Sequence, residues 1–436
     1  MSNEAAPRSW FGSVLDVTAS PAFRQALTVV IFSMSLATQF VRVVLGWPGE
    51  VAALAVVVLA AALSLAARRG EIEWRGILPV SLLAFFGWMA LSLFWSEYTW
   101  ASLGGILYAL AFAFLGAFVS LSRDLIQVVR ALGDALRAIL LASVVVEVIA
   151  GILLDTALPF LGVTGSLTVG GPIQGIAGTR NALGFVAGLA ILTFWIEIRT
   201  QSVRRVVSIP FLVLAVGLLL VSRSPVTVVV LAIVGIAGGL LVALRRMSPR
   251  TRTTVQPIVL VVGLVLAILA ATFRTQILRF LDAASDFEAR VSVWQTLNTL
   301  SERHPVEGWG WVGMWPARIF PYSSVRLPSG RPAGSGLNAF IDTFFQLGLV
   351  GMLLLAIALG LGFVRAWLVA SEARSTVNVW PALTLALLAA TAMAESYLIA
   401  EGGLVLTVAA CIAASRKRSW RRLLRDRPPG ASAPAG

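Results

Sequence analysis

The 436-residue chain has one cysteine, Cys411, one histidine, His304, and few charged residues, which make up 13% of it. A single cysteine excludes a disulfide framework and a cysteine metal cluster, and a single histidine excludes a multi-histidine zinc site. Because 58% of the residues are hydrophobic, the chain has too little polar surface for a water-soluble protein. The composition therefore indicates a polytopic membrane protein.

The carboxylates do not suggest metal chemistry either. No D-x-D motif suited to Mg²⁺ occurs among the acidic residues of the expected outer side. We therefore expect neither a metal nor a cofactor.

Apolar stretches of the length that a transmembrane helix needs, about 20 residues, occur along most of the chain. They lie near 24–46, 51–67, 76–95, 102–121, 133–154, 181–198, 206–222, 225–244, 255–273, 338–364, 379–396 and 398–415. We expect an all-α, polytopic integral membrane protein with about 12 transmembrane helices. The expected organisation is a cytoplasmic N-terminal segment (1–23), one transmembrane domain (24–415) and a basic, disordered tail (416–436).

Basic residues indicate the side of the membrane on which the termini lie. Arginines gather in the terminal-side connections near 68–75, 199–205 and 245–252 and again after residue 415, whereas the opposite connections at 48–50, 96–100 and 400–403 have none. The positive-inside rule then places both termini in the cytoplasm. A juxtamembrane basic cluster usually binds anionic lipid, so the net charge of +13 indicates membrane lipids rather than nucleic acid as partners.

Two outer-side connections, 155–180 and 274–336, are much longer than the others. Connections as long as the second tend to be functional or disordered. Order is favoured here, because Ser285 and Glu288 form a capping-box pattern that opens a helical pattern ending before Pro305. Upstream of it, the stretch 273–284 has the pattern of an amphipathic helix lying on the membrane. We expect a helical cap on the extracytoplasmic face.

Outside the long loop, arginines are scarce on the expected outer side, where they are Arg42, Arg180 and Arg223; Arg290 is one of those within the long loop. An arginine inside the membrane costs about 2.5–3.5 kcal/mol at mid-bilayer and less near a helix end. Arg223, between two spans, either reaches lipid headgroups or faces a partner. Several guanidinium groups on one face favour a partner, because their planar forks bind phosphate oxygens in bidentate fashion. A phosphate at the outer membrane surface indicates a lipid-linked substrate.

Other residues in this region have more than one interpretation. Trp294 lies one turn after Arg290, and the stretch 307–316 combines tryptophans with glycines. Tryptophan faces suit sugar stacking and equally suit an interfacial aromatic belt. His304, before a proline at a helix end, is either a capping residue or a base, and Glu147 either relays protons or is hydrogen-bonded within the bundle.

Four stretches of the chain occur in a characteristic order. They are GTRNALG (178–184), the S-R-S joint (222–224), ARVSVWQTLNTLSERHPVEGWGWVGMW (289–315) and GLNAFIDTFFQLGLVG (336–351). The last two hold an R-x-x-x-W helix, a P-x-x-G-x-G turn and an N-x-x-x-D-x-x-x-x-x-G-x-x-G pattern. In this order, around a long loop, they resemble the O-antigen ligase and polymerase family, which includes exopolysaccharide polymerases. The resemblance covers residues 180 to about 401.

The resemblance implies a GT-C-like, metal-independent glycosyltransferase in the cell membrane, with its active site on the extracytoplasmic face. Its donor would be a glycan on a polyprenyl diphosphate such as undecaprenyl diphosphate. Its acceptor would be a glycan or glycolipid of cell-surface polysaccharide biosynthesis, with the enzyme acting as polymerase or ligase. By matching position, Arg223 and Arg290 would hold the diphosphate as catalytic residues. The further substrate-binding residues would be Arg180, Asn181, Trp294, Trp309, Gly310 and Asn338.

One position departs from the pattern of the family. Members commonly have a histidine, proposed to activate the acceptor, immediately before the asparagine of the tenth-span motif, and this chain has Leu337 before Asn338. Asp342, on the same helix face as Asn338, is a substitute as catalytic residue, and His304 is a weaker one. Two other hypotheses stay open, a transporter or flippase of lipid-linked sugars and an inactive scaffold of an envelope-polysaccharide complex. The motifs name neither the sugar, the acceptor, the linkage nor the oligomeric state.

Overall fold

The computed structural model describes residues 16–70, 79–168, 170–272 and 284–417. Within these ranges the chain is helical, and it has no β-strand beyond two isolated bridges. The helices are α2 (Pro21–Leu36), α3 (Thr38–Ala67), α4 (Val80–Leu91), α5 (Thr99–Ser122), α6 (Leu125–Val148), α7 (Arg180–Thr200), α8 (Arg205–Ser222), α9 (Pro225–Arg246), α10 (Pro249–Thr272), α12 (Ala284–Ser301), α13 (Ala339–Glu372), α14 (Trp380–Ala392) and α15 (Glu401–Lys417). The expected amphipathic helix over 273–284 lies, except for Ala284, outside the described residues.

Seven of the described helices are long and apolar enough to cross a membrane: α3, α5, α6 with its one-turn extension to Leu153, α7, α8, α9 and α13. Shorter apolar helices cover Pro21–Leu36, Val80–Phe94 and Thr376–Ala392. The all-helical architecture expected from the sequence is therefore confirmed over the described residues, and the seven helices are consistent with a membrane protein, whereas the number of twelve spans stays a prediction.

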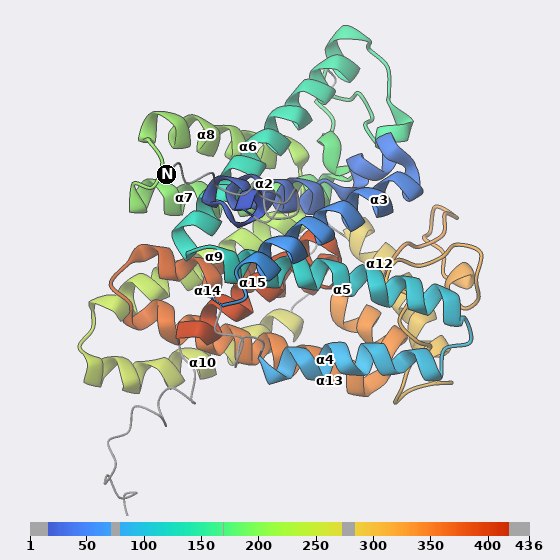
Figure 1. The fold of residues 1–436 in the computed structure, drawn as a ribbon. Coiled ribbons are helices and arrows are strands. Elements are labelled where there is room, and N and C mark those ends of the chain that lie inside the picture. Colours follow the sequence, from blue (N-terminus) through green and yellow to red (C-terminus); the bar gives the residue numbers. More distant parts are fainter. Residues whose placement is uncertain (1–15, 71–78, 169, 273–283, 418–436) are drawn as a thin grey trace, which may run out of the picture.

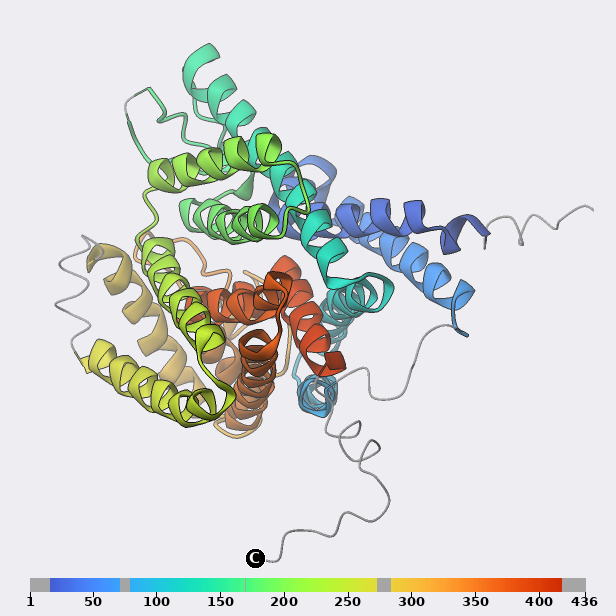
Figure 2. The same cartoon turned by 90° about the vertical axis from the view of Figure 1, so that its left-hand side faces the viewer.

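Helices α14 and α15 lie in the middle of the molecule (Figure 1). Helix α15 is buried on nearly all sides and packs against α5, α13 and α14. Glycines let these helices come close, because a Cβ at Gly116 of α5 would lie 2.6 Å from the carbonyl oxygen of Val405, and one at Gly362 of α13 would lie 2.4 Å from Sγ of Cys411. The end of α6 and the loop that follows it project from this body in both views (Figures 1 and 2).

The first expected span, 24–46, is divided between two helices. Helix α2 ends at Leu36, and α3 begins at Thr38 and is kinked at Gly46, whose φ is 71°. The break between α2 and α3 lies close to the start of α15: a Cβ at Gly402 would lie 2.7 Å from the carbonyl oxygen of Ser35. Residues 48–50, expected as an outer connection, continue α3, and Glu50 is buried.

Helix α14 is shorter than the expected span 379–396, because side chains from elsewhere bind the carbonyl oxygens that follow its end. Asn338 donates from Nδ2 to the carbonyl of Met393, and Arg290 donates from Nε to that of Ala394. Helix ends leave such carbonyls without partners inside the helix. The segment 393–400 therefore becomes a connector with one 3-10 turn, Tyr397–Ile399.

The long loop is ordered over its described part, which confirms the expected helix: α12 runs over Ala284–Ser301. After α12 the chain packs around its own apolar cluster, which comprises Val293, Leu297, Trp309, Val312, Trp315, Tyr322, Val325, Ala333 and Phe345. The cluster ties the loop to the first turns of α13.

Glycines explain how the P-x-x-G-x-G turn meets α13. Helix α13 is interrupted at Gly348, whose φ is 65°, and the segment 305–310 runs beside the interruption. Backbone hydrogen bonds join Trp309 to Phe345 at 3.1 Å and Leu349 to Pro305 at 2.9 Å. A Cβ at Gly348 would lie 2.0 Å from the carbonyl oxygen of Val306, and one at Gly308 would lie 2.4 Å from the amide of Gly348. The two backbones can approach only because both positions are glycine.

Candidate active site at the expected outer face

The first turns of α7 and α9 lie side by side. Thr179 caps α7 by accepting from the amide of Ala182, and Ser224 caps α9 by accepting from the amide of Thr227. Short polar side chains favour these cap positions because they bind amides that have no partner in the helix. A Cβ at Gly184 would lie 2.8 Å from Cβ of Ser224, so glycine allows the close approach. Two positive helix ends are thus brought together.

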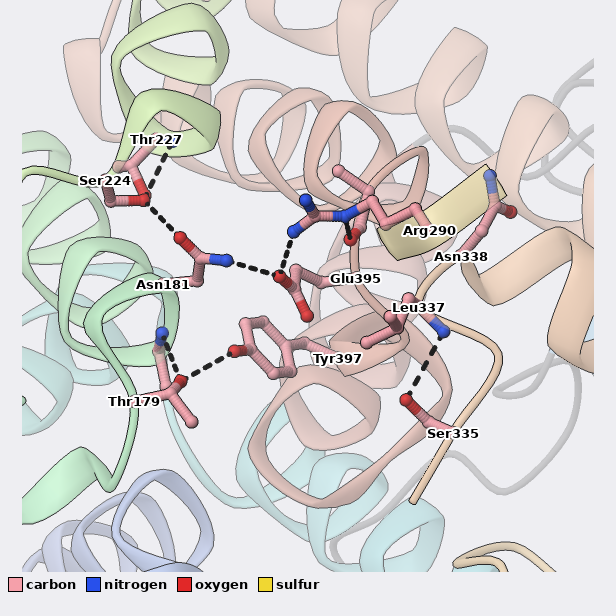
Figure 3. A network of polar contacts seen from close by, with 12 residues as sticks. Thr179, Asn181, Ser224, Thr227, Arg290, Ser335, Leu337, Asn338, Glu395 and Tyr397 are labelled. Carbon is pink, nitrogen blue, oxygen red and sulfur yellow. Dashed lines mark hydrogen bonds and ion pairs between the residues drawn. The ribbon is translucent and has the colours of Figure 1, made fainter. Parts of the chain in front are cut away.

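Asn181 and Glu395 connect these helix ends to the connector after α14 (Figure 3). Asn181 accepts from the hydroxyl of Ser224 at 2.9 Å and donates from Nδ2 to Oε1 of Glu395 at 2.7 Å. Tyr397 lies in the same network, with its hydroxyl 3.5 Å from that of Thr179. The site therefore joins three segments that are far apart in the sequence.

Arg290 reaches this network from α12, the helix of the long loop (Figure 3). Its Nη2 lies 2.9 Å from Oε1 of Glu395, and its Nε donates to the carbonyl of Ala394 at 3.0 Å. Both charged residues are buried, with 8% and 7% of their surfaces exposed. Burial of an ion pair is costly unless its members are held by further bonds, and removal of one partner typically costs about 3–5 kcal/mol. The pair fixes α12 to the connector.

Arg180 and Arg223 flank the network. Arg180 precedes Asn181 at the start of α7 and is half-buried. Arg223 precedes Ser224, ends α8 in the left-handed region with φ 48°, and is exposed. Among the described residues the Arg223 guanidinium has no hydrogen-bond or ion-pair partner. Together with Arg290, these two arginines bring three guanidinium groups to the region of the two helix ends, and Glu395 is a carboxylate in contact with Arg290.

Asn338 and Leu337 lie at the start of α13. Asn338 caps the helix by accepting from the amides of Phe340 and Ile341, and its Nδ2 binds the connector. Leu337, the residue before Asn338, has a φ of 49°, in the left-handed region that most residues avoid. Asn338 thus acts as a structural cap in this conformation, and the substrate-binding role predicted for it stays untested.

Asp342 is buried, and both of its oxygens are occupied. Oδ1 accepts from the Trp315 indole at 3.0 Å and from Gln346 at 2.7 Å, whereas Oδ2 accepts from the Gly336 amide at 2.9 Å and from the Ser396 hydroxyl at 2.7 Å. A carboxylate has about four acceptor positions, so none is left for a substrate proton. These contacts favour a positioning role, and the catalytic role predicted from the sequence stays untested.

The predicted sugar-stacking residues are built into the loop. Trp294 donates from Nε1 to the carbonyl of Gly336 at 2.9 Å, and Trp309 donates to that of Leu300 at 3.2 Å and is 7% exposed. Gly310 has a φ of 95°, and a Cβ there would lie 2.5 Å from Cβ of Ser96. In this conformation they shape the loop, and the prediction that they bind substrate stays untested.

His304 has the packing contacts of a structural residue. Its ring lies 4.6 Å from that of Trp309, and Nδ1 is 3.0 Å from the Glu307 carboxylate. The hydrogen bond from His304 lowers the pKa of Glu307. A lowered carboxyl pKa contributes stability at neutral pH that is lost as the pH falls through the lowered value.

Glu147 of α6 is hydrogen-bonded within the protein, because its Oε1 accepts from the amides of Gln174 and Gly175, both at 2.7 Å.

A second polar cluster, which the sequence did not predict, surrounds Arg42. Its Nε lies 2.6 Å from Glu50, and its Nη2 binds Glu401. The hydroxyl of Tyr108 lies 2.6 Å from Glu50 and 2.9 Å from Glu401. Glu50 and Glu401 each lie at a connection expected on the outer side, and this placement was the available signal. Nothing in the local sequence indicates that Arg42 binds Glu401, which is 359 residues away. In the described part of the chain, no three His, Cys, Asp or Glu side chains gather as metal ligands would.

Comparisons with known protein families and curated proteins do not assign this chain to a family. No protein-family model matches the chain, and no curated protein matches it. The functional argument therefore depends on the motifs and on the contacts described above.

Proposed function

We propose that this protein is a membrane glycosyltransferase that moves a glycan from a polyprenyl diphosphate to an acceptor glycan or glycolipid of a cell-surface polysaccharide. The observation that carries the proposal is the convergence of Arg290 from α12 with the first turns of α7 and α9 through Glu395 and Asn181. Helix N-termini and guanidinium groups are the two protein features that bind phosphate most readily.

The chemistry follows from the charge of the leaving group. The acceptor hydroxyl oxygen forms a bond to the anomeric carbon, and the bond from that carbon to the diphosphate oxygen breaks with its electron pair on the diphosphate. Preorganised positive groups stabilise this developing charge, and removal of one donor of this kind typically slows a reaction about 10²–10³-fold. Arg290, Arg223 and Arg180 are the residues that would supply it.

The proton of the acceptor hydroxyl needs a base. Leu337 cannot serve, and the oxygens of Asp342 are occupied. Glu395 is a carboxylate in direct contact with Arg290. When a diphosphate binds Arg290, the added negative charge favours the protonated form of Glu395 and so makes it a better proton acceptor. We assign Glu395 the role of base in this proposal.

Donor binding tests the proposal. The protein in nanodiscs is titrated with a polyprenyl-diphosphate oligosaccharide. Because a charge-assisted hydrogen bond contributes about 1.5–3 kcal/mol, Arg290→Ala is expected to weaken binding about 10- to 100-fold. Arg290→Lys keeps the charge but loses the fork, so it is expected to give an intermediate loss.

Arg326→Ala is the matched control. Arg326 lies in the same loop and is exposed, and the hydrogen bond of its side chain goes to the carbonyl of Gly330. It should bind the donor as the wild type does. Equal donor affinity of the wild type, both Arg290 variants and the control would contradict the proposal.

A transporter of lipid-linked sugars is the second candidate, because two helices are interrupted at glycine, α3 at Gly46 and α13 at Gly348. Interrupted helices form the central sites of many transporters. Here both interruptions lie beside connections expected on the outer side. Movement of labelled donor across proteoliposomes without any glycan product would favour the transporter over the transferase.

A further inference from the structure

A small cavity lies beside the Arg290 site, between α5, the long loop and the start of α15. Its volume is about 60 Å³, and its wall includes Tyr108, Trp311, Asp342, Ser396 and Glu401. Ser396 follows Glu395 directly and donates to Asp342 at 2.7 Å. The cavity is therefore separated from the proposed base by one residue of the connector.

Trp311 presents a donor that has no partner. It is 1% exposed, and among the described residues its indole Nε1 has no hydrogen-bond acceptor. A Cβ at Gly313, another residue of the cavity wall, would lie 3.6 Å from this nitrogen. Buried polar groups are almost always hydrogen-bonded, so an exception beside a cavity indicates a ligand that supplies the acceptor.

The cavity wall carries negative rather than positive charge. Glu401 and Tyr108 are held in place by Arg42 and Glu50, so one arginine stands against two glutamates, and Asp342 adds a further carboxylate. Such a wall repels a phosphate. The acceptor positions of Asp342 are filled within the protein, so Glu401 is the carboxylate of the wall that can accept a hydrogen bond from a ligand hydroxyl, while the Trp311 indole donates one. A ligand that both donates and accepts, with a neutral body, fits this combination, whereas a metal cation would gain nothing from the indole N–H.

Aromatic rings complete the match to a sugar. Tyr108 and Trp311 both line the cavity. Pockets that combine apolar rings with a few fixed polar groups are typical of small-molecule sites. At about 10–15 Å³ for each water-sized group, the cavity admits roughly four to six such groups. That is enough for the hydroxyl-bearing edge of one sugar, with the rest of the glycan outside.

We propose that this cavity is a sugar subsite that takes the hydroxyl-bearing edge of a neutral glycan, with Trp311 as donor and Glu401 and Tyr108 as the facing polar groups. Its assignment to the acceptor rather than the donor rests on the proposed function, because the diphosphate of the donor occupies the site around Arg290, on the other side of Ser396. The subsite places an acceptor beside Glu395.

Sugar binding without phosphate tests the subsite separately from the transferase reaction. The probe is the free oligosaccharide repeat unit released by mild acid from the polysaccharide of the host, added to the full-length protein in nanodiscs and followed by saturation-transfer NMR. Trp311→Phe removes the N–H but keeps a ring, and Tyr108→Phe removes the hydroxyl. Each is expected to weaken binding about three- to tenfold, as the loss of one hydrogen bond does.

Two controls accompany these variants. Trp195→Phe makes the same change in α7, at the end that carries Arg199, and Arg326→Ala removes an exposed arginine of the long loop; both should bind the oligosaccharide as the wild type does. Unchanged binding in both Trp311→Phe and Tyr108→Phe, or no binding by the wild type, overturns the subsite.

The transfer assay separates the two proposals. If the wild type transfers glycan, Trp311→Phe should raise the KM for the acceptor three- to tenfold and leave the KM for the donor unchanged. An unchanged acceptor KM overturns the subsite and leaves the transferase standing. If the wild type binds the oligosaccharide but transfers nothing, the transferase fails and the subsite stands.

Discussion

At the scale of single residues, Arg290 and Glu395 carry most of the proposal. Both are buried, they bind each other, and each also binds the chain around it. Arg290 and Asn181 could be predicted from the sequence, because they lie in recognisable motifs. Glu395 could not, since its partner lies 105 residues earlier in the chain and nothing in the local pattern marks a short connector as a site. Trp309, predicted to bind substrate, is buried among ring neighbours of its own loop, and its substrate-binding role stays a prediction.

Replacement of Glu395 by glutamine separates binding from chemistry. Glutamine has the shape of glutamate but cannot take a proton, and it no longer competes with phosphate for Arg290. We expect Glu395→Gln to bind the polyprenyl-diphosphate donor at least as tightly as the wild type and to transfer glycan about 10²–10⁴-fold more slowly, the usual contribution of a general base. Donor titration and single-turnover kinetics would measure the two effects. Unchanged single-turnover kinetics would exclude Glu395 as the base.

At the scale of elements, hydropathy predicts helices well and their interruptions poorly. The break between α2 and α3, the kink of α13 at Gly348 and the early end of α14 all arise from contacts with distant segments. A scan for apolar runs sees none of these contacts, so it merges or extends the helices. The helix in the long loop was predictable because its helical pattern and its stop before Pro305 are local, although the helix already includes Ser285, which the capping pattern placed before its first turn.

Gly348 tests whether the loop must lie against α13. We expect Gly348→Ala to lower the melting temperature strongly or to prevent folding, because a Cβ would overlap the backbone of Val306 and the φ of 65° disfavours alanine. Gly360→Ala, in the same helix with open space around it, should change the melting temperature little or raise it. Fluorescence-detected size-exclusion chromatography after heating compares the two. Equal stability would show that the loop is not packed as described.

At the scale of the whole molecule, the arrangement of the helices agrees with an all-helical membrane protein, and the charge pattern predicts its orientation. The side of the candidate site is therefore a prediction from the arginines rather than from the fold. Cysteine labelling can measure it, because the only native cysteine, Cys411, is buried and can be replaced by serine.

In that Cys411→Ser background, Ser329→Cys places a thiol at an exposed position in the long loop, and Thr253→Cys places one at an exposed position near the start of α10. The positive-inside rule predicts that a membrane-impermeant maleimide labels Ser329→Cys on intact cells and labels Thr253→Cys only after permeabilisation. Labelling of Thr253→Cys on intact cells, and of Ser329→Cys only after permeabilisation, would place the candidate site on the cytoplasmic side. The site could then not reach a lipid-linked donor on the outer face of the membrane.

The most direct measurement of the central claim is glycan transfer itself. Purified protein is incubated in EDTA with a polyprenyl-diphosphate oligosaccharide and an acceptor glycan from its host, in parallel with Arg290→Lys and Arg326→Ala. The account predicts that the wild type and Arg326→Ala extend the acceptor and release the lipid diphosphate, and that Arg290→Lys is about 10²–10³-fold slower. Equal rates for all three proteins, or no product from a wild type that binds both substrates, would contradict it.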